Sequence, residues 1–509
     1  MNAQKTKYFL LAILVVGALL RLSAYDACSY ANEEIVVINT SEEKIVAESG
    51  AWDALVSQAL YLKLLVQWRT VFATELWDRL PSLLFGIAAI WLTYLFVAEV
   101  LRFATSSGEI RKTSLRYAPL FAAVFVALNP ALISLSWQLN PYALLPAIVA
   151  LSMLAFAKVL GESFTPEQLK IRHTLPWLLV WLLVSVIGCA IHPYFALIAI
   201  GQAIASGFLL SRNKKMILPL VIFALMSASV AWMVMANAAD AIDGSIFSIA
   251  HKADAQGLLK IFNAGYLVLS EQTREMWYGV AMLAAAASIF GVALFSLFFR
   301  PGQSNLRDFC LPGMIPALAV FVIAPVILLP MTTPALIVAI VPVIMAAAAG
   351  GVCGWGSRRA MAGMMIAVVL VSLIAFGFSL HERYAQPDYR PVAKHLNQNA
   401  GDAPVVHLSL ETFKYVGIYH DDLVDQRWRP LWLASRPELR GSIIDAGGEL
   451  FVIIESVLID ELYNGSAQDF LAQIMKSSWE VVDTTDLGAY TVYRIKKPKK
   501  NYPFEMGAT

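Results

Sequence analysis

Residues 75–101 read ELWDRLPSLLFGIAAIWLTYLFVAEVL, and this stretch decides the fold class of the chain. Its apolar part, Leu83–Leu101, carries a single charged side chain, Glu99, close to its end. A helix needs about 20 predominantly apolar residues to cross a hydrocarbon core that is roughly 30 Å thick. The stretch therefore predicts a membrane-spanning helix that follows a cluster of charged residues.

Similar apolar runs recur along the chain, and about eleven of them are long enough to cross a bilayer. Their approximate bounds are Tyr8–Tyr25, Leu83–Leu101, Leu120–Trp137, Tyr142–Leu160, Leu175–Ile191, Tyr194–Leu210, Met216–Met235, Tyr278–Phe299, Leu311–Leu329, Pro334–Trp355 and Met361–Leu380. The composition agrees, because 58% of the 509 residues are hydrophobic and 15% are charged, whereas soluble domains contain about 25% charged residues. The sequence thus predicts a polytopic α-helical membrane protein. A net charge of +1 speaks against a nucleic-acid-binding surface.

Basic residues fall in alternate loops between the predicted spans, as Arg212, Lys214 and Lys215 do after the sixth. The intervening turns, such as Gln138–Pro141, carry no Lys or Arg. By the positive-inside rule the N-terminus is cytoplasmic, and an odd number of spans places the C-terminus on the far side of the membrane.

Three regions are expected outside the membrane, all on the far side: 26–81, 236–277 and the tail 381–509. In the tail, Val405–Leu410, Leu450–Glu455, Trp479–Asp483 and Tyr490–Ile495 have the pattern of strands, and Arg390–Asn399 and Asp460–Lys476 that of amphipathic helices. Asp486-Leu487-Gly488 is a hairpin signal. We therefore expect a transmembrane module over 1–380 and a small soluble α/β domain over 381–509.

The exit of the first predicted span is acidic. The stretch Asp26-Ala-Cys-Ser-Tyr-Ala-Asn32-Glu33-Glu34 places three carboxylates and one side-chain amide directly after it. Ionisable groups at membrane depth are costly and tend to be functional, and a partly desolvated carboxylate can serve as a general base. A helix that ends in hydrated headgroups explains the same residues, so both interpretations stay open.

An amphipathic stretch, Trp52–Phe72, follows and is typical of a helix that lies along the membrane interface. Polar residues also occur at the far-side ends of later spans: Gln138, Asn140 and Tyr142 in one turn, and His192 and Tyr194 in another. Neither a Walker sequence nor a glycine fingerprint after a strand is present, so nothing predicts nucleotide binding. An enzyme on this side must use an activated substrate that the membrane delivers, such as a lipid-linked phosphate.

Several stretches match one known pattern in order along the chain. They are Arg21-Leu22 with Tyr30–Glu33, Leu60–Trp68 with Glu75–Gly86, Asn129–Leu145, Ile191–Leu197 and Asp388–Leu396. Together they resemble the GT-C superfamily of membrane glycosyltransferases, in the family 39-like branch of dolichyl-phosphate-mannose–protein mannosyltransferases and bacterial lipid A sugar transferases. The match is close over roughly the first two hundred residues and architectural beyond them.

The resemblance implies a glycosyltransferase of the bacterial inner membrane, with the tail domain in the periplasm. It would move a hexose or pentose from a polyprenyl phosphate to a lipid, glycan or protein acceptor, inverting the anomeric carbon. Glu33 would be the general base, with Glu34 and Asp26 as alternatives. The implied substrate-binding residues are Asn32, Lys63, Arg69, Arg79, Gln138, Asn140, Tyr142, His192 and Tyr194. The sequence demands no cofactor and is compatible with assistance by Mg²⁺ or Mn²⁺.

The sequence departs from the family pattern at Asn32, which stands where the family has an aspartate. An amide does not accept a proton as a carboxylate does, so a catalytically silent scaffold stays an alternative. A transporter or flippase of lipid-linked substrates is a second alternative. Such a protein should show inverted repeats and charges in the middle of its spans, and the sequence shows neither feature.

Overall fold

The computed structural model describes most of the predicted spans and part of the tail. The described residues are 3–30, 34, 37–38, 60–72, 74–106, 116–164, 171–191, 195, 198–199, 201–202, 267, 277–299, 333–354, 358–401, 403, 405–407, 428–430, 449–455 and 480–496. Their contacts divide the chain into a helical unit, Met1–Asp26 with Val36–Tyr384, and a second unit, Ala27–Ile35 with Ala385–Thr509. Residues 27–35, from the first predicted loop, thus belong with the C-terminal residues.

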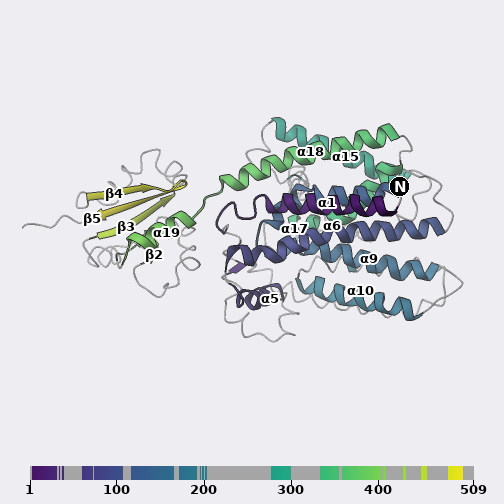
Figure 1. Ribbon diagram of the computed structural model, residues 1–509, viewed down its shortest axis with the longest axis horizontal. Helices are drawn as coiled ribbons and strands as arrows, with labels where there is room; N and C mark the ends of the chain where they lie inside the picture. The colour runs from purple at the N-terminus through teal and green to yellow at the C-terminus, as the bar shows by residue number, and fades with distance from the viewer. Residues whose placement is uncertain are drawn as a thin grey trace, which may run out of the picture. The chain divides into compact units, whose positions relative to one another are not determined.

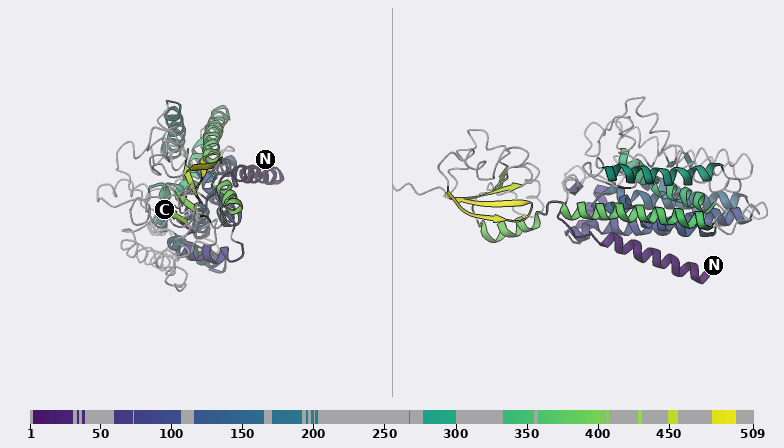
Figure 2. Two further views of the ribbon diagram at one scale, coloured as in Figure 1. Left: turned by 90° about the vertical axis from the view of Figure 1, so that its left-hand side faces the viewer. Right: turned by 90° about the horizontal axis from the view of Figure 1, so that it is seen from above.

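The helical unit is a bundle in which long helices lie side by side (Figures 1 and 2). Its described elements are α1 (Ala3–Leu22), α5 (Leu60–Arg69), α6 (Glu75–Ser106), α7 (Ala118–Ala127), α8 (Pro130–Ser136), η2 (Pro141–Ala143), α9 (Leu145–Phe164), α10 (Ile171–Ile191), α15 (Trp277–Phe299), α17 (Thr333–Gly354) and α18 (Arg358–Ala385). Helix α6 is central, because it packs against α1, α7, α9 and α17.

Three helical stretches among the described residues are long and apolar enough to cross a membrane: Glu75–Arg102, Pro141–Val159 and Arg359–Asn399. Shorter apolar helices cover Ala118–Ala127, Leu175–Ile191, Gly279–Ile289 and Ile340–Cys353. This is a polytopic helical membrane fold, as the sequence predicts. The predicted spans 216–235 and 311–329 lie outside the described residues. Of the predicted span 194–210, only 195, 198–199 and 201–202 are described.

The predicted third span, Leu120–Trp137, is not one helix. Its first part belongs to α7, which ends at Ala127, and its last part belongs to α8, which begins at Pro130. The residue before a proline is pushed toward extended backbone, and Asn129 accordingly has ψ 115° and caps α8 by accepting the Leu132 N–H at 2.9 Å. The apolar pattern is continuous across 120–137, so it gave no sign of this break.

Buried Arg21 donates hydrogen bonds to backbone carbonyls at this break. Pro130 has no N–H to donate to the carbonyl of Val126, four residues earlier. Arg21 donates to Val126 O at 3.2 Å and to Ala127 O at 3.1 Å instead. The fit is close, because a Cβ on Gly86 would lie 3.0 Å from Arg21 Nε and 2.3 Å from Ser136 Oγ. The arginine side chain thus provides the hydrogen bonds that lipid cannot.

The C-terminal unit is a small α/β domain. Helix α19 (Arg390–Asn399) precedes β1 (Val405–His407), β2 (Trp428–Pro430), β3 (Glu449–Glu455), β4 (Glu480–Asp486) and β5 (Tyr490–Lys496). The sheet order is β2-β1-β3-β5-β4, with β1 parallel to β2 and β3, and β5 antiparallel to β3 and β4. Buried residues such as Phe451, Ile453 and Val492 form its core.

The predicted elements of the tail are largely confirmed. Helix α19 has the predicted bounds, and β1, β3, β4 and β5 overlap the four predicted strands. Leu487 N donates to Tyr490 O at 2.8 Å across the predicted hairpin, where Gly488 has φ 82°. Strand β2 was not predicted, because three residues ending in proline carry little strand signal. The predicted helix 460–476 lies outside the described residues.

Candidate functional site

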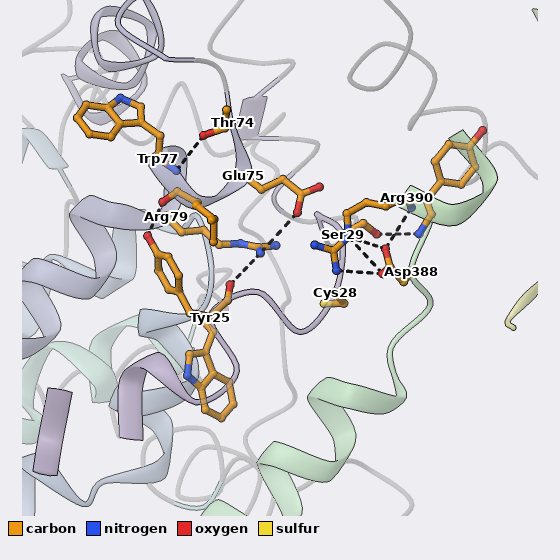
Figure 3. A network of polar contacts seen from close by, with 12 residues as sticks. Tyr25, Cys28, Ser29, Thr74, Glu75, Trp77, Arg79, Asp388 and Arg390 are labelled. Atoms are coloured by element: carbon orange, nitrogen blue, oxygen red, sulfur yellow. Dashed lines mark hydrogen bonds and ion pairs between the residues drawn. The ribbon is translucent and has the colours of Figure 1, made fainter. Parts of the chain in front are cut away.

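The exit of α1 is tied to the start of α6 within the helical unit. The Tyr25 hydroxyl donates to the Leu76 carbonyl, and Arg79 Nη1 donates to Tyr25 O at 3.2 Å. Arg79 is fully buried, and its Nη1 lies 4.0 Å from Glu75 Oε2, one helical turn earlier (Figure 3). The predicted substrate-binding Arg79 therefore holds the turn that follows α1.

An ion pair joins α5 to α6. Arg69 Nε lies 3.1 Å from Asp78 Oδ2, and the Asp78 side chain is fully buried. A buried carboxylate is costly unless it is paired, so this contact fixes the last turn of α5 against the first turns of α6. The predicted substrate-binding Arg69 thus has a carboxylate partner in the same unit.

Two tryptophans form a second joint between these helices. Their rings stack with centroids 4.4 Å apart and an interplanar angle of 7°. Pro81 cannot donate to the carbonyl of Trp77, four residues before it, and the Trp68 indole N–H donates to that carbonyl at 2.8 Å. The Trp77 indole donates in return to Trp68 O at 3.1 Å, near the C-terminus of α5. Each tryptophan thus satisfies a carbonyl of the other helix.

Lys63 lies on the opposite side of α5 from the buried residues Tyr61 and Leu65, because helical residues advance by about 100° each. Its side chain is half-buried. Within the part of the chain that the structure describes, no ion pair or hydrogen bond of Lys63 occurs. Lys63 therefore differs from Arg69 and Arg79, which both hold helices together.

The three predicted carboxylates fall into different surroundings. Asp26 is exposed at the end of the α1 exit turn, in the helical unit. Glu34 is helical and only 1% exposed, and it belongs to the C-terminal unit. Glu33 and Asn32 lie outside the described residues.

The turn between α8 and α9 contains three further predicted residues. The Asn140 side chain accepts the Tyr142 N–H at 2.9 Å and caps η2, while Gln138 and Tyr142 are half-buried. Arg383 of α18 donates to the Trp137 carbonyl at 3.0 Å and holds this turn from the side. His192 and Tyr194 lie outside the described residues.

Sequence reasoning missed Asp78 and Arg383. Asp78 had a weak signal as an acid in the first turns of a helix, where the macrodipole favours it. The sequence carried no signal for Arg383, because its acceptor is a backbone carbonyl far away in sequence. No group of three His, Cys, Asp or Glu side chains that could hold a metal ion occurs among the described residues.

No protein-family model and no curated protein matches the sequence. A solved structure of ArnT from Cupriavidus metallidurans bound to undecaprenyl phosphate aligns over 97% of this chain and 98% of that chain, at 11% identity and a TM-score of 0.51. Its apo state aligns over the same shares, at 13% identity and a TM-score of 0.53. This chain shares its fold with ArnT.

The likeness to ArnT covers both units, since it extends over nearly the whole chain. The fold expected from the resemblance is thereby confirmed. An oligosaccharyltransferase from Archaeoglobus fulgidus, tethered with an acceptor peptide, aligns over 89% of this chain and 70% of that chain, at 12% identity and a TM-score of 0.47.

Proposed function

We propose that this protein is an integral-membrane glycosyltransferase that moves a sugar from a polyprenyl phosphate to an acceptor on the periplasmic face of the inner membrane. The observation that carries the proposal is the fold shared with ArnT, one structure of which holds undecaprenyl phosphate. The acceptor is a lipid, a glycan or a protein. The acidic stretch after α1, which resembles the superfamily's first-loop motif, supports the same function.

The chemistry is a displacement at the anomeric carbon. Glu33 removes the proton from an acceptor hydroxyl while its oxygen bonds to the anomeric carbon from the opposite side. The bond between that carbon and the phosphate oxygen breaks, and the polyprenyl phosphate leaves with the bonding electrons. Among the alternatives, buried Glu34 ranks before exposed Asp26, because a general base works best when it is partly desolvated.

The departing phosphate needs positive charge nearby. We assign the direct contact to Lys63, because Arg69 pairs with Asp78 and Arg79 binds Tyr25 O and lies near Glu75. The two arginines add to the local positive potential and fix α5 and α6, which position Lys63. Asn32, Gln138, Tyr142, His192 and Tyr194 are proposed to line the donor and acceptor pocket, with Asn140 shaping its turn.

The decisive experiment measures transfer from a radiolabelled polyprenyl-phosphate sugar to membrane extract. We expect Glu33→Gln to lower the rate by about 10²–10⁴-fold, the usual contribution of a general base, with unchanged expression and melting temperature. Glu34→Gln and Asp26→Asn are the matched variants. Full activity in Glu33→Gln, with loss in one of these two, would move the assignment to that residue. Chelation by EDTA tests whether Mg²⁺ or Mn²⁺ assists.

The same preparation separates the two alternative functions. A flippase would move the labelled lipid across liposomes without forming a glycosylated product. A silent scaffold would do neither. Either result in the wild-type protein would contradict the proposed transfer.

A further inference from the structure

Helix α19 of the C-terminal unit receives no side-chain cap from Tyr389, the residue that precedes it. Tyr389 is the N-cap, and its side chain makes no capping hydrogen bond. The first N–H groups of a helix have no partner within it. Here the N–H of Arg390 donates to Asp388 Oδ1 at 3.1 Å, and Pro391 has no N–H. The N–H of Tyr389 must therefore find an acceptor elsewhere.

Ser29, from the stretch that follows α1, provides that acceptor. The Tyr389 N–H donates to Ser29 Oγ at 3.0 Å, and the same hydroxyl donates to Pro387 O at 3.5 Å. Both residues are almost fully buried. Next to Ser29, the Cys28 thiol donates to Gln386 Oε1 at 3.4 Å. Figure 3 shows Cys28 and Ser29 beside the segment of Asp388 and Arg390.

The link continues into the sheet. The Tyr389 ring meets the Tyr490 ring edge to face at a centroid distance of 5.7 Å. Tyr490 is the first residue of β5, is 1% exposed and pairs with Glu455 of β3. Ser29 is therefore linked, through Tyr389, to the buried residue Tyr490 of the sheet.

The acidic stretch begins directly after this anchor. Glu33 is four residues beyond Ser29, and an extended chain covers at most about 3.6 Å per residue. The chain between Ser29 and Glu33 therefore spans at most about 14 Å. Tyr30 and Glu34, on either side of it, are 3% and 1% exposed and belong to the same unit.

We infer that Ser29 is a positioning residue for the catalytic carboxylate, and that the C-terminal domain takes part in catalysis through its contact with Ser29. This inference rests on the proposed function. In it, the N-terminus of α19 holds the acidic stretch through the Ser29 hydroxyl.

The test compares Ser29→Ala with Ser29→Thr in the full-length protein. The Ala variant should lower kcat by about 10-fold or more, because a misplacement of roughly 1 Å can cost about 10²-fold. Its KM for the donor should stay within about two-fold, because the cations proposed to hold the phosphate belong to the helical unit. The Thr variant keeps the hydroxyl and should restore kcat. Ser23→Ala is the matched control, since the exposed Ser23 hydroxyl donates to Leu20 O of its own helix end.

A double variant tests whether Ser29 acts through the carboxylate. In a Glu33→Gln background, Ser29→Ala should cause no further loss of kcat, whereas independent effects would multiply. A further 10-fold loss in that background would overturn the inference. So would a wild-type kcat in Ser29→Ala, or a change in KM alone.

Hydrogen exchange keeps the inference separate from the proposed function. In Ser29→Ala, deuterium uptake should rise in peptides that cover 27–35 and 386–392, but not in peptides from α9. If the wild-type protein transfers no sugar, the proposed function fails while this measurement still decides whether Ser29 holds the acidic stretch. Unchanged uptake in both peptides would overturn the inference even in an active enzyme.

Discussion

Helix α6 carries a buried carboxylate near each end, and the two differ in the origin of their partners. Near its start, Asp78 pairs with Arg69 of α5, beyond the turn that joins the two helices. Near its other end, Glu99 pairs with Lys158 of the neighbouring helix α9 and with Arg102 of its own next turn, the latter at 2.6 Å. Both carboxylates are less than a tenth exposed.

Pairing of buried charge therefore does not by itself mark a functional end of a membrane helix. A carboxylate removed from water must be paired wherever it lies, so both clusters meet a structural need. Glu99 joins two neighbouring helices of the bundle. Asp78 holds α5, the helix that carries Lys63. We therefore expect the first cluster to affect both stability and donor use, and the second to affect stability alone.

Asp78→Asn should have the largest effect on stability. Breaking a buried ion pair by removing one charge typically costs about 3–5 kcal/mol. The melting temperature in detergent should fall, and the KM for the polyprenyl-phosphate donor should rise several-fold because α5 is less firmly held. Adding Arg69→Gln should recover part of the stability by removing the second charge of the pair.

Glu99→Gln is the matched change at the other end of α6. Its basic partners reach water, with Arg102 59% and Lys158 22% exposed. The loss should be smaller, about 1–3 kcal/mol, with kcat and KM unchanged at temperatures where the variant is folded. A rise in donor KM as large as that of Asp78→Asn would remove the distinction between the two ends.

The tryptophan joint gives a sharper test of the first end. Trp68→Phe keeps an aromatic ring but removes the only side-chain donor found for Trp77 O among the described residues, which should cost about 1–3 kcal/mol. Trp77→Phe should cost less, because Trp68 O also accepts the Val71 N–H at 3.2 Å. Thermal unfolding of both variants measures which of them loses more stability.

Pro81→Ala provides the cross-check for this joint. It returns an N–H that can reach Trp77 O within α6, so Trp68→Phe should cost less in the Pro81→Ala background than alone. Equal costs in the two backgrounds would mean that the indole N–H does not replace the missing helical donor.

The prolines also show how much of the fold could be predicted from the sequence. The apolar runs located the long described helices α1, α6, α9, α10, α15, α17 and α18, because crossing a bilayer demands length and hydrophobicity that few other structures share. The same prolines state which carbonyl loses its helical donor, Val126 for Pro130 and Trp77 for Pro81. The sequence does not state the replacement donors, Arg21 and Trp68, because these come from other helices and depend on packing.

The sequence predicts the candidate site as a region, and that stays a prediction; it does not predict the contacts that the structure shows there. The acidic stretch, the interfacial helix and the polar turn were all recognised from residue type and position. Arg69 and Arg79 carried the same signal as Lys63, since each is a cation beside the membrane surface. Only the structure separates them, through Asp78 and Tyr25. Ser29 carried no signal, because its partner is a backbone N–H about 360 residues away.

The pair of Glu449 and Arg494 adds a partly exposed salt bridge to the comparison with the two buried carboxylates. It joins β3 to β5, and the two side chains are 27% and 43% exposed. The hydrogen bond from Arg494 holds the pKa of Glu449 below its ordinary value of 4.5, and this outweighs the opposite effect of partial burial. Exposed pairs contribute about 0–1 kcal/mol, so this effect should be the smallest.

The sign of its pH dependence follows from the lowered pKa. Because the folded protein releases the Glu449 proton more readily than the unfolded chain, the pair stabilises above about pH 4.5. That stabilisation is lost as the pH falls through the lower pKa of the folded state. Melting temperatures of the wild type and Glu449→Gln should therefore differ slightly at pH 7, converge in acid, and converge also in high salt. A difference that persists in acid would show that the ion pair is not its source. A difference as large as that of Asp78→Asn would show that burial does not govern the strength of these three pairs.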